Sequence, residues 1–474
     1  MGSRQGFLKD AFLRRFPYEP TPCQYSLLDK VADFLTSDEG DILVVNGYAG
    51  TGKTAALAAV IGAMTELEVP CVLLAPTGRS AKVLSAYAGR PASTIHKHIY
   101  RQKSFGADGL GQFSLMPNKA RGTLFVVDEV SLIGIESQGS AFGSGNLLED
   151  LITFVRSGVD CKIILSGDDA QLPPVGLDAS PALSPACMNG FGGVRFATLT
   201  TVVRQGADSG ILRNATHLRQ LLAGDVDGLP VSRLGLVDGC PDMVRIAGGE
   251  LIETLSDAYG RYGEEDVVVL CRSNKRAVRY NAGIRAQVQY REEQLVRGDK
   301  LMIVKNCYLS GLEGTDYIAN GDVARLVRIR HFEERYGLHF ADAVLAFPDY
   351  GNQEVETKVL LDTLSSESAS LTREQSQALW EGVSADYAHL RTKKKRYDAI
   401  REDPFYRAMQ LKYAEAVTCH KAQGGQWRCV FVDNPVWQDF LTADDVKWLY
   451  TALTRAVDQV YLVNFRDELF GSPA

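Results

Sequence analysis

The sequence lacks the features that would place the protein in a membrane or outside the cell. Its apolar runs, such as Leu124–Val127, are far shorter than the roughly 20 residues of a membrane-spanning helix. The N-terminus carries basic residues from Arg4 to Arg15 and no apolar segment of the secretory type. Nine scattered cysteines include no CxxC pair, which argues against a disulfide framework or a zinc ribbon. We therefore expect a cytoplasmic protein with reduced thiols and no membrane association.

Internal repeats, low-complexity tracts and an excess of positive charge are also missing. The 474 residues include 51 Lys+Arg and 58 Asp+Glu, a formal net charge of −7. This acidic balance does not predict a nucleic-acid binder, so such a function has to rest on local features. A hydrophobic content of 45% is ordinary for globular proteins, and the length allows about three domains.

Short β-rich runs alternate with helical segments in the first 200 residues. The expected strands are Asp41–Asn46, Cys71–Pro76, Thr123–Glu129 and Cys161–Asp168. Each ends at a polar or Gly-rich turn, and Thr54–Thr65 has the composition of a helix. This alternation predicts a parallel sheet with crossover helices. The rhythm returns between residues 266 and 287 and between 429 and 465, so we expect two α/β lobes.

Two segments interrupt this rhythm. Lys97–Arg121, rich in Gly, Ser and Lys, is expected to form a small insertion in the first lobe. Arg297–Leu361 alternates in hydrophobicity and contains Gly-Asp turns, which predicts a small antiparallel barrel or sheet. Ser365–Met409 follows as polar helix with the basic stretch Arg391–Arg396. Such a charge run is usually a solvated helix face, and a DNA clamp is the alternative.

The segment Gly47-Tyr48-Ala49-Gly50-Thr51-Gly52-Lys53-Thr54 fits the pattern G-x-x-x-x-G-K-[ST]. It lies between an expected strand and an expected helix, which is the context that phosphate binding requires. Glycines let the backbone wrap the phosphates, and the helix N-terminus attracts the anion. Lys53 would reach the β- and γ-phosphates, and Thr54 would hold Mg²⁺. The segment therefore predicts ATP and Mg²⁺ as cofactors.

Two later strand ends supply further candidates for phosphoryl-transfer chemistry. Asp128, at the end of Phe125-Val126-Val127, would hold Mg²⁺, and Glu129 would activate the attacking water as general base. In Gly167–Val175, the side-chain amide of Gln171 is a candidate sensor of the γ-phosphate. A Pro-rich loop without such a role is the alternative for that segment.

These segments, taken in order, resemble the motifs of superfamily 1 helicases and are similar to the 1B branch, which includes RecD, the phage helicase Dda and the Pif-type helicases. The segments that carry the resemblance are Pro22-Cys23-Gln24 (Q motif), Gly47–Thr54 (motif I), Ala75–Ala81 (motif Ia), Ser93–Lys97 (the short motif after it), Asp128-Glu129 (motif II), Gly167–Val175 (motif III), Leu199–Gln205 (motif IV), Val417–Gly424 (motif V) and Tyr450–Ala456 (motif VI). They span nearly the whole chain.

The resemblance implies an α/β fold with two RecA-like P-loop lobes built on parallel sheets, a small 1B insertion and an SH3-like β insertion, 2B. The expected lobe 1A covers residues 1–200, with the 1B insertion at about 97–121. Lobe 2A would comprise residues 201–296 and 410–474. The 2B insertion with its helical extension would occupy residues 297–409.

The resemblance also implies roles for individual residues. The nucleotide would be bound by Gln24, Gly47, Gly50, Gly52, Lys53, Thr54 and Ala55. Arg204 and Arg455 would act as arginine fingers from the second lobe, because a positioned guanidinium stabilises the charge on the transferred phosphoryl group. Single-stranded DNA would be contacted by Thr77, Thr94, His96, Thr418 and His420. Helix caps and buried hydroxyls are the alternative for each of these.

The resemblance to Dda-type helicases also implies that Phe113, in the 1B-like insertion, forms a strand-separating pin at the duplex junction. An aromatic face stacks on a base with about 1–3 kcal/mol, comparable to the DNA stacking step of about 1.4 kcal/mol. The alternative is that Phe113 packs its hairpin onto the lobe, and Phe105 or Tyr100 are other candidates for the pin.

The function expected from the resemblance is that of a monomeric, ATP-dependent DNA helicase. It would translocate 5′ to 3′ on single-stranded DNA and unwind duplex DNA at junctions between single and double strands. The alternatives are a DNA-stimulated ATPase that remodels protein–DNA complexes and a RecD-like subunit of a nuclease complex. A nuclease-like spacing, Pro348-Asp349 followed by Glu356-Thr357-Lys358, is better explained by an ordinary hairpin turn.

Overall fold

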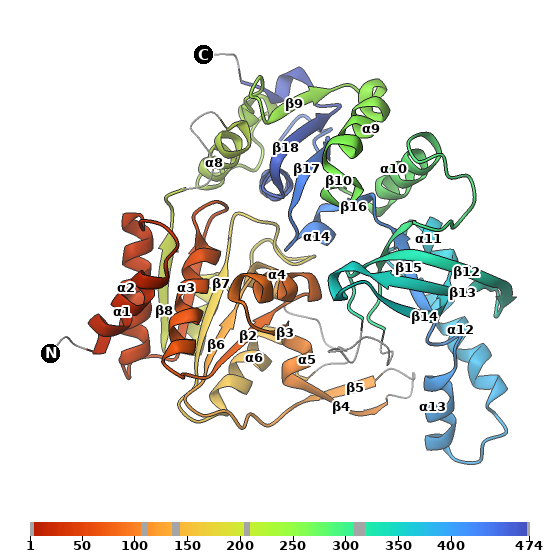
Figure 1. Cartoon of the computed structure of the whole chain (residues 1–474), viewed down its shortest axis with the longest axis horizontal. Helices are drawn as coiled ribbons and strands as arrows, with labels where there is room; N and C mark the ends of the chain where they lie inside the picture. The colour runs from red at the N-terminus through yellow and green to blue at the C-terminus, as the bar shows by residue number, and fades with distance from the viewer. Residues whose placement is uncertain (1–3, 106–110, 135–142, 203–208, 308–317, 472–474) are drawn as a thin grey trace.

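The computed structural model describes residues 4–105, 111–134, 143–202, 209–307 and 318–471. Within these ranges the chain forms two parallel sheets, a closed barrel and a two-stranded hairpin (Figure 1). None of the helices in these ranges has the length and apolar character needed to cross a membrane. The predicted α/β fold class with a β insertion is confirmed.

The first sheet has the strand order β3-β2-β6-β7-β1-β8, and all of its pairs are parallel. Its strands are β1 (Ile42–Gly47), β2 (Cys71–Ala75), β3 (Ala92–Thr94), β6 (Leu124–Val127), β7 (Lys162–Gly167) and β8 (Val194–Leu199). Alternate side chains of β1 point to opposite faces, as in any strand. Leu43 and Val45 join one hydrophobic core, and Ile42 and Val44 join another. The sheet is therefore covered on both faces.

Helices from both sides complete this first lobe. They are α1 (Arg4–Arg15), α2 (Pro22–Thr36), α3 (Lys53–Glu66), α4 (Gly78–Ala88), α5 (Ile95–Ile99) and α6 (Leu147–Arg156). Helices α1 to α4 contribute to one core, and α5 and α6 contribute to the other. After α5 the chain leaves the sheet as the hairpin of β4 (Tyr100–Phe105) and β5 (Gly111–Leu115), which extends away from the lobe (Figure 1). This hairpin lies inside the segment expected as the 1B insertion.

The second sheet has the order β16-β10-β17-β18-β9 and is also parallel throughout. Its strands are β9 (Met243–Ile246), β10 (Val267–Cys271), β16 (Ala416–Thr418), β17 (Trp427–Asp433) and β18 (Ala456–Val463). Helices α8 (Gly210–Leu222) and α15 (Ala443–Leu453) pack on one face, and α9 (Leu251–Tyr262) and α10 (Asn274–Gln287) pack on the other. Two segments far apart in the chain thus build one lobe.

The barrel is inserted between those two segments. Its strands are β11 (Lys300–Ile303), β12 (Val323–Arg335), β13 (Leu338–Phe347), β14 (Gln353–Leu360) and β15 (Met409–Tyr413). Strand β15 pairs with both β11 and β14 and so closes the barrel. The sequence pattern places the barrel within Arg297–Leu361, but the last strand, β15, comes after the helical extension and crosses the expected end of the 2B insertion at 409. The expected polar helix over Ser365–Met409 is two main helices, α12 (Arg373–Asp386) and α13 (Lys393–Glu402).

Candidate nucleotide site and nucleic-acid interface

The Gly47–Thr54 loop connects β1 to α3 with the backbone geometry of a phosphate-binding loop. Gly50 and Gly52 both have φ of +77°, a region that glycine enters without strain. A Cβ atom at Gly52 would also lie 2.4 Å from Gln24 Nε2. Gly52 begins α3 without a side-chain cap, so the first N–H groups of the helix are available to an anion.

Gln24 lies buried beneath this loop and has both ends of its amide engaged. Its Oε1 accepts the N–H of Thr21 at 2.9 Å as part of a capping box for α2. Its Nε2 donates to the carbonyl of Thr51 at 2.8 Å. The side chain thus supports the loop directly. Its predicted contact with adenine stays a prediction and requires these bonds to be exchanged.

Asp128 and Glu129 follow β6 at the carboxyl end of the first sheet. Asp128 is buried, and its Oδ1 accepts the hydroxyl of Ser166 at 2.8 Å. Glu129 has φ of +56°, which is costly for a residue with a side chain and typical of functional sites. Its Oε2 is buried and has no hydrogen-bond partner among the described residues. A buried acceptor in this state is suited to orient a water molecule.

The charges around Glu129 belong to both lobes. Burial raises the pKa of Glu129. The negative charges of Asp128 and Asp168 raise this pKa further, and the cations of Lys53 and Arg455 oppose the shift. Lys53 is in the P-loop and Arg455 follows α15 in the second lobe. The geometry therefore brings together the predicted phosphate lysine, the predicted base and one predicted arginine finger.

The second lobe is hydrogen-bonded directly to the P-loop. The hydroxyl of Tyr450, on α15, accepts the N–H of Ala49 at 2.8 Å and donates to Asp168 Oδ2 at 2.8 Å. The guanidinium of Arg219, on α8, lies 4.2 Å from the ring centre of Tyr48. A nucleotide in the P-loop would consequently meet groups that are fixed to the other lobe.

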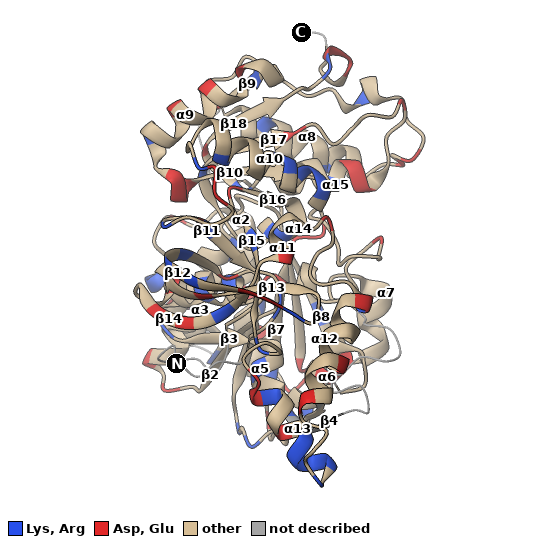
Figure 2. Cartoon of the chain, turned by 90° about the vertical axis from the view of Figure 1, so that its right-hand side faces the viewer, with Lys and Arg blue, Asp and Glu red and all other residues tan. Residues whose placement is uncertain are grey.

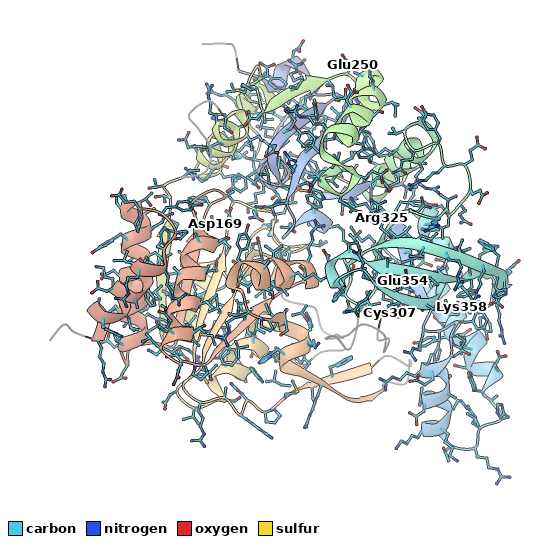
Figure 3. The ribbon with its side chains drawn as sticks, in the orientation of Figure 1. Asp169, Glu250, Cys307, Arg325, Glu354 and Lys358 are labelled. Carbon is cyan, nitrogen blue, oxygen red and sulfur yellow. The ribbon has the colours of Figure 1, made fainter. Side chains whose placement is uncertain are left out.

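The loop after β7 makes a second set of contacts between the lobes. The N–H of Leu172 donates to Thr451 Oγ1 at 2.8 Å, and Gln423 Nε2 donates to the carbonyl of Leu172 at 2.8 Å. Leu172 itself is part of the hydrophobic core of the second lobe. Asp169, labelled in Figure 3, lies at the edge of the first lobe that faces the second. The predicted sensor, Gln171, therefore lies in a loop that connects the two lobes.

Gln171 and Arg455 are both buried at this junction. Gln171 Nε2 lies 3.4 Å from Asp168 Oδ2, and its Oε1 has no partner in the described part of the chain. Arg455 donates to the carbonyls of Thr451 at 3.1 Å and Gly425 at 3.3 Å. The other predicted finger, Arg204, lies outside the described residues.

The residues expected to hold Mg²⁺ fit the way in which proteins bind that ion. Thr54 is in the first turn of α3, and Asp128 is a buried carboxylate at a strand end. Among the described residues, no group of three or more His, Cys, Asp or Glu side chains could hold a metal ion. Mg²⁺ typically uses one or two carboxylates together with substrate phosphates rather than such a group.

The three threonines expected to contact DNA lie where a strand ends and a helix begins. Thr77, Thr94 and Thr418 are the N-cap residues of α4, α5 and α14 (Cys419–Ala422). Thr77 caps the N–H of Ser80 at 3.1 Å, and Thr94 caps the N–H of Lys97 at 3.3 Å. Thr418 makes no such cap bond. Thr77 Oγ1 also shares a hydrogen bond of 2.8 Å with Ser80 Oγ. A capping hydroxyl would contact a phosphate through its single O–H donor.

The two histidines of this set differ in their surroundings. The rings of His96 and Tyr100 lie 5.7 Å apart. His420 is half-buried, and burial lowers its pKa, which favours the neutral imidazole. Their roles on DNA stay predictions. The threonines and histidines of both lobes follow strands β2, β3 and β16, whose carboxyl ends form the usual binding edge of parallel sheets.

Phe113 lies within β5, opposite Gln102 of β4. Its ring is partly buried against the hydrophobic core formed with α5 and α6. This contact supports the packing alternative, and the role of Phe113 as a pin stays a prediction. The side chain of Phe105 lies outside the described residues, and Tyr100 is buried and donates to Asp150 at 2.6 Å.

We expect Phe113→Ala to separate these two roles. If Phe113 is a pin, the variant should keep DNA-stimulated ATP hydrolysis and unwind several-fold more slowly, because one phenyl face offsets roughly the stacking lost per opened base pair. If Phe113 is a packing residue, the variant should unfold at a lower temperature and lose both activities together. Parallel measurements of ATPase, unwinding and thermal unfolding distinguish the two results.

Several residues at the junction between the lobes received no role in the sequence analysis. Arg79, on α4, stacks on Trp427 of β17 with 4.1 Å from its guanidinium carbon to the ring centre. A Cβ at Gly425 would lie 2.5 Å from Arg79 Nε, so a side chain at this position would displace the guanidinium of Arg79. Tyr450 and Arg79 both belong to segments that resemble helicase motifs, and this resemblance could have indicated a role for them. No pattern in the sequence indicates a role for Arg219.

The nuclease-like spacing lies on the β13–β14 hairpin. Lys82 Nζ pairs with Asp349 at 3.1 Å, and Lys358 Nζ pairs with Asp342 at 2.8 Å. These ion pairs assign the charged groups to the surface of the barrel. The interpretation as an ordinary turn agrees with this geometry.

Comparisons with known proteins agree with the two-lobed site. Residues 29–229 match the family model of an AAA domain, and residues 413–463 match that of a UvrD-like helicase C-terminal domain. The ATP-dependent RecD2 DNA helicase of Deinococcus radiodurans is 28% identical over 444 residues, which cover 92% of this chain and 48% of the relative. The ATP-dependent DNA helicase dda of Enterobacteria phage T4 is 30% identical over 135 residues, 28% of each protein.

Among solved structures, Pif1 helicase from Bacteroides in complex with ADP-AlF3 and ssDNA is similar at a TM-score of 0.49 and 15% identity, over 96% of this chain and 95% of that one. This chain spans about half the length of its RecD2 relative.

The fold and the site define a P-loop NTPase with two RecA-like lobes that meet at the nucleotide site. The two matched family models and the two curated relatives show that the chain is similar to the superfamily 1B group of RecD- and Dda-type helicases.

Proposed function

We propose that the chain is an ATP-dependent DNA helicase that translocates on single-stranded DNA and unwinds duplex DNA. The observation that carries this proposal is the Tyr450 hydroxyl, which bonds Ala49 of the P-loop and Asp168 of the first lobe. A nucleotide that alters the P-loop changes the groups that hold the second lobe. Such a link is what couples ATP hydrolysis to motion between lobes.

The proposed chemistry assigns ATP to the Gly47–Thr54 loop and Mg²⁺ to Thr54 and Asp128. Lys53 binds the β- and γ-phosphates, and Glu129 takes a proton from the attacking water. Arg455 and Arg204 stabilise the charge on the transferred phosphoryl group. Gly47, Gly50 and Gly52 let the backbone approach the phosphates, together with Ala55 in the first turn of α3, and Gln24 binds the adenine.

The proposed DNA path crosses the carboxyl ends of both sheets. Thr77, Thr94 and His96 contact the strand in the first lobe, and Thr418 and His420 contact it in the second. Hydroxyl and imidazole donors suit phosphate contacts that break and reform at each step. As the lobes open and close, alternate contact by the two sets moves the strand. The expected direction is 5′ to 3′.

We also propose the unit boundaries that the resemblance implies, with the barrel insertion extended to Tyr413. Lobe 1A is residues 1–200 with 1B at about 97–121, and lobe 2A is residues 201–296 and 414–474. The active form is proposed to be a cytoplasmic monomer that acts at junctions between single and double strands.

Forked DNA substrates with a single 5′ or 3′ tail test this function. We expect DNA-stimulated ATP hydrolysis and unwinding from the 5′ tail. Unwinding from the 3′ tail alone would reverse the proposed polarity. Stimulated ATPase without unwinding of either substrate would favour a translocase that remodels protein–DNA complexes. Activity only after addition of nuclease subunits would favour the RecD-like alternative, and the mass of the pure chain in solution tests the monomer.

A further inference from the structure

The helical extension of the barrel carries an exposed cluster of positive charge that the proposed function leaves unassigned. This cluster, the basic tip, consists of Arg391, Lys393, Lys394 and Lys395, all exposed at the start of α13. Figure 2 shows it as a blue segment at the lower end of the molecule. We propose that the basic tip binds the phosphates of the duplex ahead of the fork. This inference rests on the proposed helicase function.

The fold does not use these charges. Within the part of the chain that the structure describes, Lys393, Lys394 and Lys395 form no ion pair. The neighbouring Arg396 differs, because it donates to the carbonyls of Ala388 at 3.0 Å and Leu390 at 3.3 Å. Arg396 thus ties α13 to the preceding turn and does not belong to the basic tip.

Several other basic residues of the barrel and its extension are paired. Lys358 Nζ lies 2.8 Å from Asp342, and Arg335 lies 2.6 Å from Asp386. The basic tip differs from these paired cations. On a chain with a net charge of −7, an uncompensated cluster of four cations provides local attraction for a polyanion that the whole molecule does not.

The basic tip lies at the N-terminal end of α13, where its positive charge lowers the stability of that helix. Thr392 caps α13 by accepting the N–H of Lys395 at 3.3 Å, and the first turn contains no acidic residue. The N-terminal end of a helix carries partial positive charge, so cations there are unfavourable and anions are favourable. Helix stability thus does not explain three consecutive lysines, whereas bound phosphates would offset their repulsion.

The location of the basic tip selects the duplex as its partner. Both views place α13 beside the β4–β5 hairpin, beyond the barrel as seen from β10 and β16 (Figures 1 and 2). The proposed single-strand path follows the carboxyl ends of strands on the other side of the barrel. The hairpin carries the proposed strand-separating element, so the DNA next to it is the unopened duplex.

The test compares two triple variants that lose the same charge. One is Lys393→Ala/Lys394→Ala/Lys395→Ala. The matched control is Arg4→Ala/Arg14→Ala/Lys30→Ala, which removes three exposed cations from α1 and α2 at the opposite side of the molecule (Figure 1). Affinity for a forked duplex and for single-stranded DNA is measured at salt concentrations between 50 and 200 mM, together with thermal unfolding and single-strand-stimulated ATPase.

We expect the lysine variant to bind the fork with a weaker salt dependence. Each phosphate contact contributes about 0.9 to the slope of log K against log salt, so three contacts contribute about 2.7. Over this fourfold salt range, the wild type should then lose about 40-fold more affinity for the fork than the lysine variant. Single-strand binding, ATPase and the unfolding midpoint should match those of the wild type, as should all properties of the control.

Three results would overturn the inference. An unchanged salt slope on the fork shows that the basic tip makes no phosphate contact. An equal loss in both variants shows an effect of net charge, and an equal loss on single-stranded DNA assigns the tip to the tracking strand instead. Failure of the proposed function is distinguishable, because the wild type itself would then show no single-strand-stimulated ATPase.

Discussion

Replacing Lys53 by alanine should abolish ATP hydrolysis while the chain remains folded. The ammonium group of Lys53 is the P-loop cation beside the buried carboxylates of Glu129 and Asp168. It acts as a point charge on the phosphates rather than as a packing residue. Loss of one preorganised donor of this kind typically lowers turnover by about 10²–10³-fold, and we expect at least that effect.

Steady-state ATPase with saturating single-stranded DNA measures this result. Lys30→Ala, which removes an exposed lysine from α2, is the matched control and should retain wild-type turnover. Because Lys53 also offsets the charge of two buried carboxylates, thermal unfolding of both variants is measured in parallel. A Lys53→Ala protein that is folded and hydrolyses ATP at the wild-type rate would show that this loop is not the catalytic P-loop.

The parts of the site that are local in sequence could be predicted. A strand, a Gly-rich loop and a helix within residues 42–66 determine one another through short-range geometry, and α3 begins at the predicted lysine. Asp128 and Glu129 could be placed because an apolar run ends directly before them. The barrel could be predicted from alternating hydrophobic and polar residues and from Gly-Asp turns, because a hairpin is formed by residues that are close in sequence.

The contacts between lobes could not be predicted in the same way. Ala49 and Tyr450 are separated by 401 residues, and nothing in either local pattern specifies that they meet. The stacking of Arg79 on Trp427 and of Arg219 on Tyr48 depends equally on how the lobes dock. Such contacts arise from tertiary packing, which a single sequence does not encode as a period or a spacing.

The last strand of the barrel was missed for a related reason. Strand β15, Met409–Tyr413, is only five residues long and pairs with β11 and β14, both remote in sequence. Its short pattern resembles the start of the second α/β segment that follows. The break between α12 and α13 was similarly hidden in a continuous polar stretch, where Thr392 provides the only clear N-cap for α13.

The second large effect is expected from Glu129→Gln. Glu129 combines a positive backbone φ, a buried Oε2 without a partner in the described residues, and the electrostatic influence of the cations Lys53 and Arg455. These features suit a general base that receives its water only when the nucleotide is bound. The amide keeps the shape and removes the proton acceptor, so ATP should bind normally while turnover falls by about 10²–10⁴-fold.

The pH dependence of hydrolysis provides an independent check on this role. Burial raises the pKa of Glu129, and a general base works only above its pKa, where it is ionised. In the wild type, kcat should therefore fall with decreasing pH before an ordinary exposed glutamate would titrate, and this acidic limb should be missing from the residual activity of Glu129→Gln. Fluorescent-nucleotide binding and kcat are measured across the same pH range, with Glu149→Gln, an exposed glutamate on α6, as the matched control. Weakened ATP binding with undiminished turnover would remove Glu129 from the role of base and assign it to nucleotide binding.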